Sequence, residues 1–125
     1  MTNHAVLSAS ASHRWLNCPP SVRLTEDMPD VTSEFALEGT DAHELCAYLV
    51  EKALGRKVRD PTKDLSFYNE EMQTCAEEYR NYVMEQVEKA KGYSRDPTVL
   101  VEQRLDFSKW VPEGFGTGDC LIVAD

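Results

Sequence analysis

Three side chains in this sequence have the types and the placement needed to bind a divalent cation. His43 lies in the segment EGTDAHE (residues 38–44). Asp119 ends the segment GTGD (residues 116–119) and leads into an apolar run, and Glu102 lies on the segment before it. Hard cations prefer carboxylate oxygens, and manganese also accepts imidazole. Because a bound cation polarises a phosphate and activates an attacking water, the chemistry we expect is phosphodiester hydrolysis.

Each of these residues also has an ordinary structural interpretation, and the sequence leaves both interpretations open. His43 could be a half-buried helix histidine with a local hydrogen bond. The GTGD segment could be a glycine-rich turn whose aspartate bonds its own backbone, and Glu102 could lie on the outer face of a strand. In the functional interpretation, glycines at 114, 116 and 118 let a substrate backbone approach closely.

The elements that position these residues follow from the spacing of apolar side chains. Two long segments repeat at helical spacing, the first ending at Gly55 and the second capped by Ser66. Prolines end a shorter N-terminal helix, and β-branched residues near the C-terminus predict strands. The expected elements are helices at about 10–17, 34–54 and 66–91, and strands at about 98–107 and 117–124.

This order of helices followed by strands predicts one α+β domain, with N-terminal helices packed on the first strands of a mixed sheet. The run CLIVA (residues 120–124) is apolar enough for a central strand, which needs a neighbour on each side. We therefore expect the 125 residues to be the N-terminal part of a domain whose sheet is incomplete here.

Composition limits the classes of partner. The net charge is −9, with 13 Lys and Arg against 22 Asp and Glu, which argues against broad non-specific attraction to nucleic acid. No apolar run is long enough to span a membrane, and no signal peptide is present, so we expect a cytoplasmic protein without a membrane partner. We expect reduced, buried thiols at the four widely spaced cysteines, which are Cys18, Cys46, Cys75 and Cys120.

The ordered set of motifs resembles the RecB-like branch of the PD-(D/E)XK nuclease superfamily. The segment SASASHRWLNCPP (residues 8–20) comes first, EGTDAHE (38–44) comes second, and Glu102 followed by GTGD (116–119) comes third. The resemblance spans nearly the whole chain. It is greatest for uncharacterised phage and prophage proteins.

The resemblance implies a metal-dependent DNA nuclease, of exonuclease type, that serves phage DNA processing or recombination. It gives the family's metal-binding roles to His43 and Asp119, with Glu102 as an additional acidic residue and Mg²⁺ or Mn²⁺ as the cofactor. The implied partners are DNA in the complete protein and a recombination protein. Some relatives hold an iron–sulfur cluster through a cysteine at the place of Cys18, but its three partner cysteines have no counterpart, so no cluster is expected.

The family's later D/E-x-K motif also has no counterpart, because Asp125 is the last residue. We therefore expect this chain to be inactive by itself. Two alternatives remain open. One is a catalytically dead nuclease-like module that binds DNA or a recombination partner, and the other is an unrelated α+β interaction domain in which His43 and Asp119 are structural.

Overall fold

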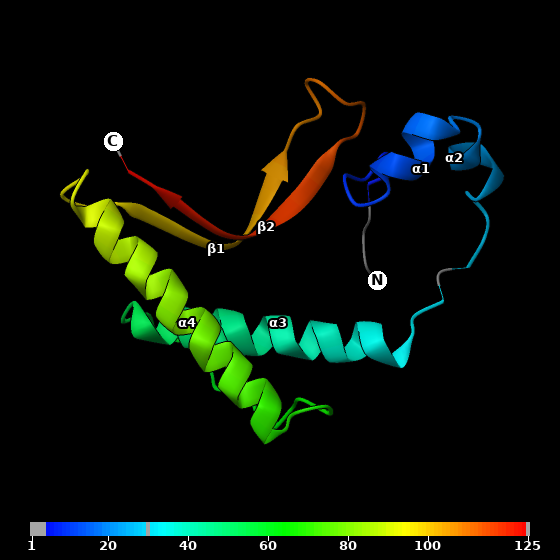
Figure 1. The fold of residues 1–125 in the computed structure, drawn as a ribbon. Helices are drawn as coiled ribbons and strands as arrows, with labels where there is room; N and C mark the ends of the chain where they lie inside the picture. Colours follow the sequence, from blue (N-terminus) through cyan, green and yellow to red (C-terminus); the bar gives the residue numbers. More distant parts are fainter. Residues whose placement is uncertain (1–4, 30, 125) are drawn as a thin grey trace. The chain divides into compact units, whose positions relative to one another are not determined.

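The structure is a computed structural model that describes residues 5–29 and 31–124. Within these ranges the elements, in chain order, are α1 (Ser12–Asn17), α2 (Ser21–Leu24), α3 (Glu34–Ala53), α4 (Glu70–Lys91), β1 (Thr98–Asp106) and β2 (Phe115–Val123) (Figure 1). The two strands pair as an antiparallel sheet, and the fold class is α+β, as the sequence predicts. The short helix α2 lies in residues 21–32, where the proline and the charged residues predict an irregular or loosely helical connection.

The chain divides into two compact units. The first consists of the described parts of residues 1–31 together with residues 103–118, and the second of residues 32–102 and the described part of 119–125. Each strand therefore contributes to both units. The three candidate ligands, His43, Glu102 and Asp119, all belong to the second unit.

Helix α3 has a defined signal at each end, which explains why its bounds are close to the predicted ones. The Ser33 side chain accepts a hydrogen bond of 3.2 Å from the backbone N–H three residues further on. At the other end Gly55 has φ of +80°, which favours glycine. Its N–H donates to the Lys52 carbonyl at 3.1 Å, and the Arg56 N–H donates to the Glu51 carbonyl at 3.0 Å, which is the Schellman pattern.

Helix α4 begins four residues later than predicted, and Ser66 is not its cap. Asn69 caps it instead, because its side chain accepts a hydrogen bond of 2.7 Å from the Met72 N–H. The chain just before Asn69 forms a turn, in which the Tyr68 N–H donates to the Leu65 carbonyl at 3.4 Å, and Phe67 anchors this turn. The Phe67 ring packs on the core, and its N–H donates to the Asp41 carboxylate at 2.9 Å. A tertiary contact therefore decides between two possible caps.

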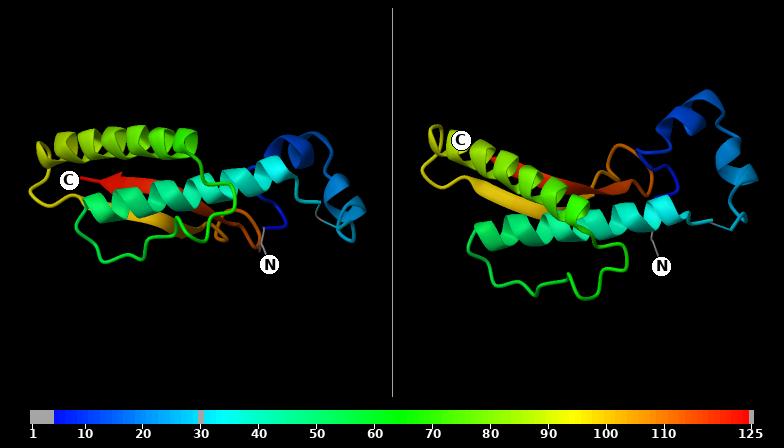
Figure 2. Two further views of the ribbon diagram at one scale, coloured as in Figure 1. Left: turned by 90° about the horizontal axis from the view of Figure 1, so that it is seen from below. Right: turned by 60° about the horizontal axis from the view of Figure 1, so that its bottom comes forward.

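Two apolar clusters form the core of the second unit. The first joins the middle of α3 to the start of α4 and contains Leu45, Leu49, Leu65, Met72 and Ala76. The second, which we call the helix–sheet cluster, contains Val50, Val83, Val87 and Val99, with Leu54, Tyr79, Val101, Cys120 and Ile122 packed against it. Both helices lie on the same side of the sheet (Figures 1 and 2). The sheet face that contains Val99 and Ile122 is therefore covered.

The expectation that all four cysteines are buried is corrected. Cys18 and Cys75 are exposed, while Cys46 and Cys120 are half-buried, so the prediction of buried thiols is wrong for the first two. The apolar stripe of α4 follows Met72 and Ala76, and Cys75 lies beside that stripe. Within the described residues the sheet has two antiparallel strands, and helices pack on them, which agrees with the expected α+β fold. Also within this part of the chain, no helix combines the length and apolarity needed to cross a membrane.

Gly114 closes the turn between the strands, in the first unit. Its carbonyl accepts a hydrogen bond of 3.1 Å from the Phe107 N–H, and its own N–H donates to the Val111 carbonyl at 2.8 Å. A Cβ atom at Gly114 would lie 2.7 Å from the Phe107 ring and 2.8 Å from the Val111 carbonyl oxygen. The expectation that Gly114 opens space for a substrate is therefore wrong, because the Phe107 side chain fills that space.

We predict that Gly114→Ala lowers the free energy of unfolding by about 1–3 kcal/mol, because the added methyl group must displace the Phe107 ring. Urea denaturation followed by circular dichroism measures this change. Gly39→Ala is the matched control. Gly39 lies inside α3, with nothing within 4 Å of an added Cβ, so that substitution should raise stability by about 0.5–1 kcal/mol. A Gly114→Ala variant as stable as the original chain would show that the Phe107 contact does not constrain the turn.

Candidate metal centre

His43 is placed by the helix that carries it. Leu45 and Cys46, which follow it, contribute to the first core cluster, and Asp41 before it bonds to Phe67. The His43 side chain itself remains 60% exposed. In the EGTDAHE motif, therefore, Asp41 is a structural residue that ties α3 to the segment before α4, and His43 is available to solvent. No pattern in the sequence predicts the hydrogen bond between Asp41 and Phe67.

Glu102 is placed by an unusual backbone conformation. Its φ is +52° within β1, a conformation that L side chains rarely adopt. In a regular strand, Val101 and Glu102 would point to opposite faces. Here both line one cavity of about 210 Å³, next to α3. Such a conformation is typical of a β-bulge, which changes the direction of a side chain. The Glu102 carboxylate therefore lies on the side of the sheet that faces α3.

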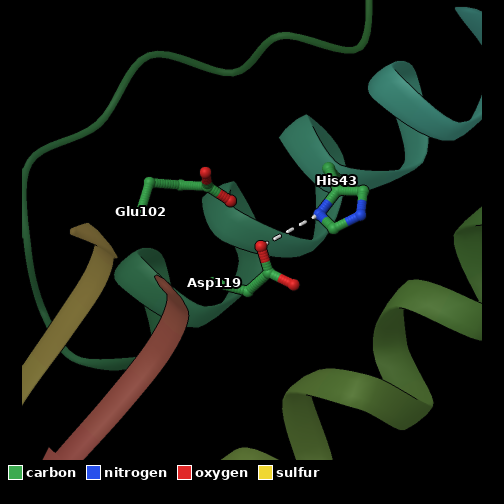
Figure 3. Close-up of side chains that lie close together, drawn as sticks. All are labelled: His43, Glu102 and Asp119. Carbon is green, nitrogen blue, oxygen red and sulfur yellow. Dashed lines mark ion pairs between the residues drawn. The ribbon is translucent and has the colours of Figure 1, made fainter. Parts of the chain in front are cut away.

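Asp119 lies on β2 and completes the cluster. Its Oδ1 atom lies 3.6 Å from His43 Nδ1, and its side chain is 59% exposed. One ligand atom from each of His43, Glu102 and Asp119 lies within 4.8 Å of the other two. Figure 3 shows the three side chains converging from α3, β1 and β2. The structure therefore brings together all three candidate ligands that were chosen from the sequence.

Comparison with known protein families gives one match. Residues 4–125 match DUF2800, whose description is "protein of unknown function". The chain belongs to this family. No solved structure matches the chain. Because the description of DUF2800 names no activity, the chemistry of this member has to be argued from the geometry of its own residues.

In this DUF2800 chain the Glu102 and Asp119 carboxylates repel each other. Partial burial is the main cause that raises the pKa of Glu102, and the neighbouring Asp119 carboxylate raises it further, while His43 acts in the opposite direction. The ionised form of Glu102 is thus disfavoured in the metal-free fold. A bound cation would offset the repulsion between the Glu102 and Asp119 carboxylates.

The donor set fits a small divalent cation. Ligand atoms bound at about 2.1 Å in an octahedron lie roughly 3 to 4.2 Å apart, so the present separations need only small side-chain rotations. The exposure of the cluster leaves positions for water ligands. One imidazole with two carboxylates suits Mn²⁺ better than Mg²⁺, which accepts nitrogen less readily.

The remaining polar groups of the cavity are neutral. Burial is the main cause that raises the pKa of the Cys46 and Cys120 thiols, which disfavours the thiolate forms that soft metals select. Burial also raises the pKa of Tyr79, and the nearby Asp119 and Glu102 carboxylates add to this effect. The donors available to a cation in the DUF2800 site are therefore carboxylate oxygen and imidazole nitrogen atoms.

We predict that Glu102→Gln raises the melting temperature of the metal-free chain at pH 7 by about 1–3 °C, an effect limited by solvent screening. The folded state holds the Glu102 proton more tightly than the unfolded chain does. Its ionised form therefore destabilises the fold, and this cost appears as the pH rises above the ordinary glutamate pKa. The gain should disappear below about pH 4, where the wild-type carboxyl is also neutral.

Glu113→Gln is the control for this measurement. Glu113 also has a positive φ, of +55°, but lies outside the cluster. Thermal melts at several pH values compare the two variants. An equal response of both would show that repulsion within the cluster does not contribute to stability.

Proposed function

We propose that this DUF2800 chain is the N-terminal part of a metal-dependent DNA nuclease in which His43, Asp119 and Glu102 hold Mn²⁺ or Mg²⁺. The observation that carries the proposal is the convergence of these three side chains, distant in the sequence, within 4.8 Å of one another. An imidazole with two carboxylates on a solvent-exposed surface is a donor set that suits a hydrolytic cation.

The order of the motifs supports the same function. It resembles that of the RecB-like branch of the PD-(D/E)XK nucleases, in which a helix histidine and an aspartate after a glycine-rich turn bind the metal. The corresponding residues here are His43 and Asp119. On this resemblance we propose phage DNA processing or recombination as the process and DNA as the substrate of the protein that contains this chain.

The residues of the chain would perform distinct tasks. A cation at the cluster supplies polarisation of a phosphate oxygen and a lower pKa for a bound water. His43 and Asp119 fix the position of the ligand atoms, because α3 and β2 are both anchored in the helix–sheet cluster. Glu102 adds a second carboxylate from the neighbouring strand, so that two negative charges balance a divalent cation.

The acidic character of the chain favours a second candidate function. With a net charge of −9, the protein suits a basic protein partner better than bare DNA. In this alternative the domain is nuclease-like in fold, holds a cation without cutting, and binds a recombination protein. Both candidate functions predict metal binding, and only the nuclease function predicts DNA cleavage.

We predict that Mn²⁺ raises the melting temperature of the chain, because a ligand that binds only the folded state stabilises it in proportion to its occupancy. His43→Ala and Asp119→Asn should each weaken Mn²⁺ binding by at least tenfold and remove most of the shift. Differential scanning fluorimetry over a Mn²⁺ titration measures this. His13 is an exposed histidine on α1, in the first unit. The control variant His13→Ala should therefore keep the full Mn²⁺-dependent rise in melting temperature.

A cleavage assay with the protein encoded by the whole reading frame then distinguishes the two candidate functions. Incubation of that protein with DNA and Mn²⁺ should give cleavage that both ligand variants lose. Mn²⁺ binding without cleavage would favour the binding module. A chain that shows no Mn²⁺ response at all would overturn the metal-centre proposal itself.

A further inference from the structure

A large groove lies directly beside the candidate metal centre. Its volume is about 1030 Å³, and it lies between α4 and β2 in the second unit. Asp119 and Tyr79 line this groove, and both also line the 210 Å³ cavity that contains His43 and Glu102. The groove and the metal cluster therefore meet at Asp119 and Tyr79.

The wall of the groove that α4 supplies carries hydrogen-bond donors and no carboxylate. Tyr79, Tyr82, Gln86 and Lys89 follow one another at spacings of three or four residues, which places them on one face of the helix. Lys89 also pairs with Glu85 at 3.3 Å on an exposed surface, a contact of small energy. Among the described residues that line the groove, Asp119 is the one carboxylate. This face can therefore accept an anionic ligand.

Among the α4 donors that line the groove, Tyr79 is the one that also lines the cavity with the metal cluster. Its ring packs against the helix–sheet cluster and is half-buried, so the direction of the side chain is fixed by the core. Its phenol carries one O–H donor and no charge at neutral pH. Tyr82, three residues further along, is 62% exposed and lines only the groove. The two tyrosines thus share chemistry and differ in their distance from the metal ligands.

We propose that Tyr79 is a phosphate-binding residue, whose hydroxyl donates a hydrogen bond to a non-bridging oxygen of a phosphodiester held at the metal centre, while the rest of the ester lies in the groove along α4. This inference rests on the proposed function, because the cation is what draws the phosphate to this place. A phosphate at the metal centre lies near the Glu102 and Asp119 carboxylates, which carry the same negative charge as the phosphate. A neutral donor on the opposite wall adds attraction without altering the charge that the cation must balance, and hydrogen bonds to ionised acceptors are strong.

The experiment compares Tyr79→Phe with Tyr82→Phe in the full chain. Each substitution removes only a hydroxyl and keeps the ring, so the packing of Tyr79 is retained. Isothermal titration calorimetry measures binding of Mn²⁺ alone, and then of bis(4-nitrophenyl) phosphate in saturating Mn²⁺. Tyr79→Phe should weaken diester binding about tenfold and leave Mn²⁺ affinity unchanged. Tyr82→Phe removes a groove donor that does not line the metal cavity, so it should leave Mn²⁺ affinity unchanged and weaken diester binding clearly less than Tyr79→Phe does.

The outcomes distinguish this inference from the proposal on which it rests. A wild-type chain that does not bind Mn²⁺ overturns the proposed function. If Mn²⁺ binds but the diester does not, or if Tyr79→Phe binds the diester as tightly as the wild type, the role of Tyr79 is overturned and the metal centre stands. Equal weakening in both tyrosine variants also overturns it, because the effect would not depend on proximity to the metal ligands.

Discussion

The helix–sheet cluster holds the strands that carry Glu102 and Asp119 against the helix that carries His43. Val50 of α3 is 1% exposed and Val99 of β1 is 8% exposed, so each is committed to this interior. A slip of β1 by one residue would exchange its two faces and expose Val99 to water. The Arg56 guanidinium, just after α3, also donates to the Val99 carbonyl. The register that buries the valine is therefore the register that places the ligands.

This fixed register also explains how β1 maintains an unfavourable conformation at Glu102. A non-glycine residue with positive φ costs on the order of 1–3 kcal/mol and persists only where its surroundings determine it. Val99 and Val101 on the same strand pack against the cluster, which leaves little freedom for the residue that follows them. The strained position is one of the three candidate ligands. Glu113 has a similar positive φ outside the cluster, so the role proposed for Glu102 rests on its convergence with His43 and Asp119 and not on the backbone conformation alone.

The parts of this arrangement that depend on local sequence could be predicted, and those that depend on tertiary contacts could not. The spacing of apolar residues and a terminal glycine located α3, and the motifs selected His43 and Asp119. Ser66 and Asn69 are both capable caps, and only the anchoring of the intervening chain to the core selects Asn69. Glu102 carries no local signal for its positive φ, so its convergence with the other ligands becomes visible only in the folded chain.

The acidity of the whole chain does not decide whether a phosphate can bind at the cluster. At physiological ionic strength charges are screened over about 8 Å, so a bound phosphate responds mainly to groups in its immediate surroundings. Those groups include Glu102 and Asp119, the His43 ring and the uncharged Tyr79 on the α4 wall, and Glu51 is near enough to raise the pKa of Glu102. A divalent cation cancels the two carboxylates and leaves a neutral pocket with a donor on one side. In the proposed function the attraction for a phosphate would come from the cation itself, so an acidic chain would not need a basic patch to hold an acidic substrate.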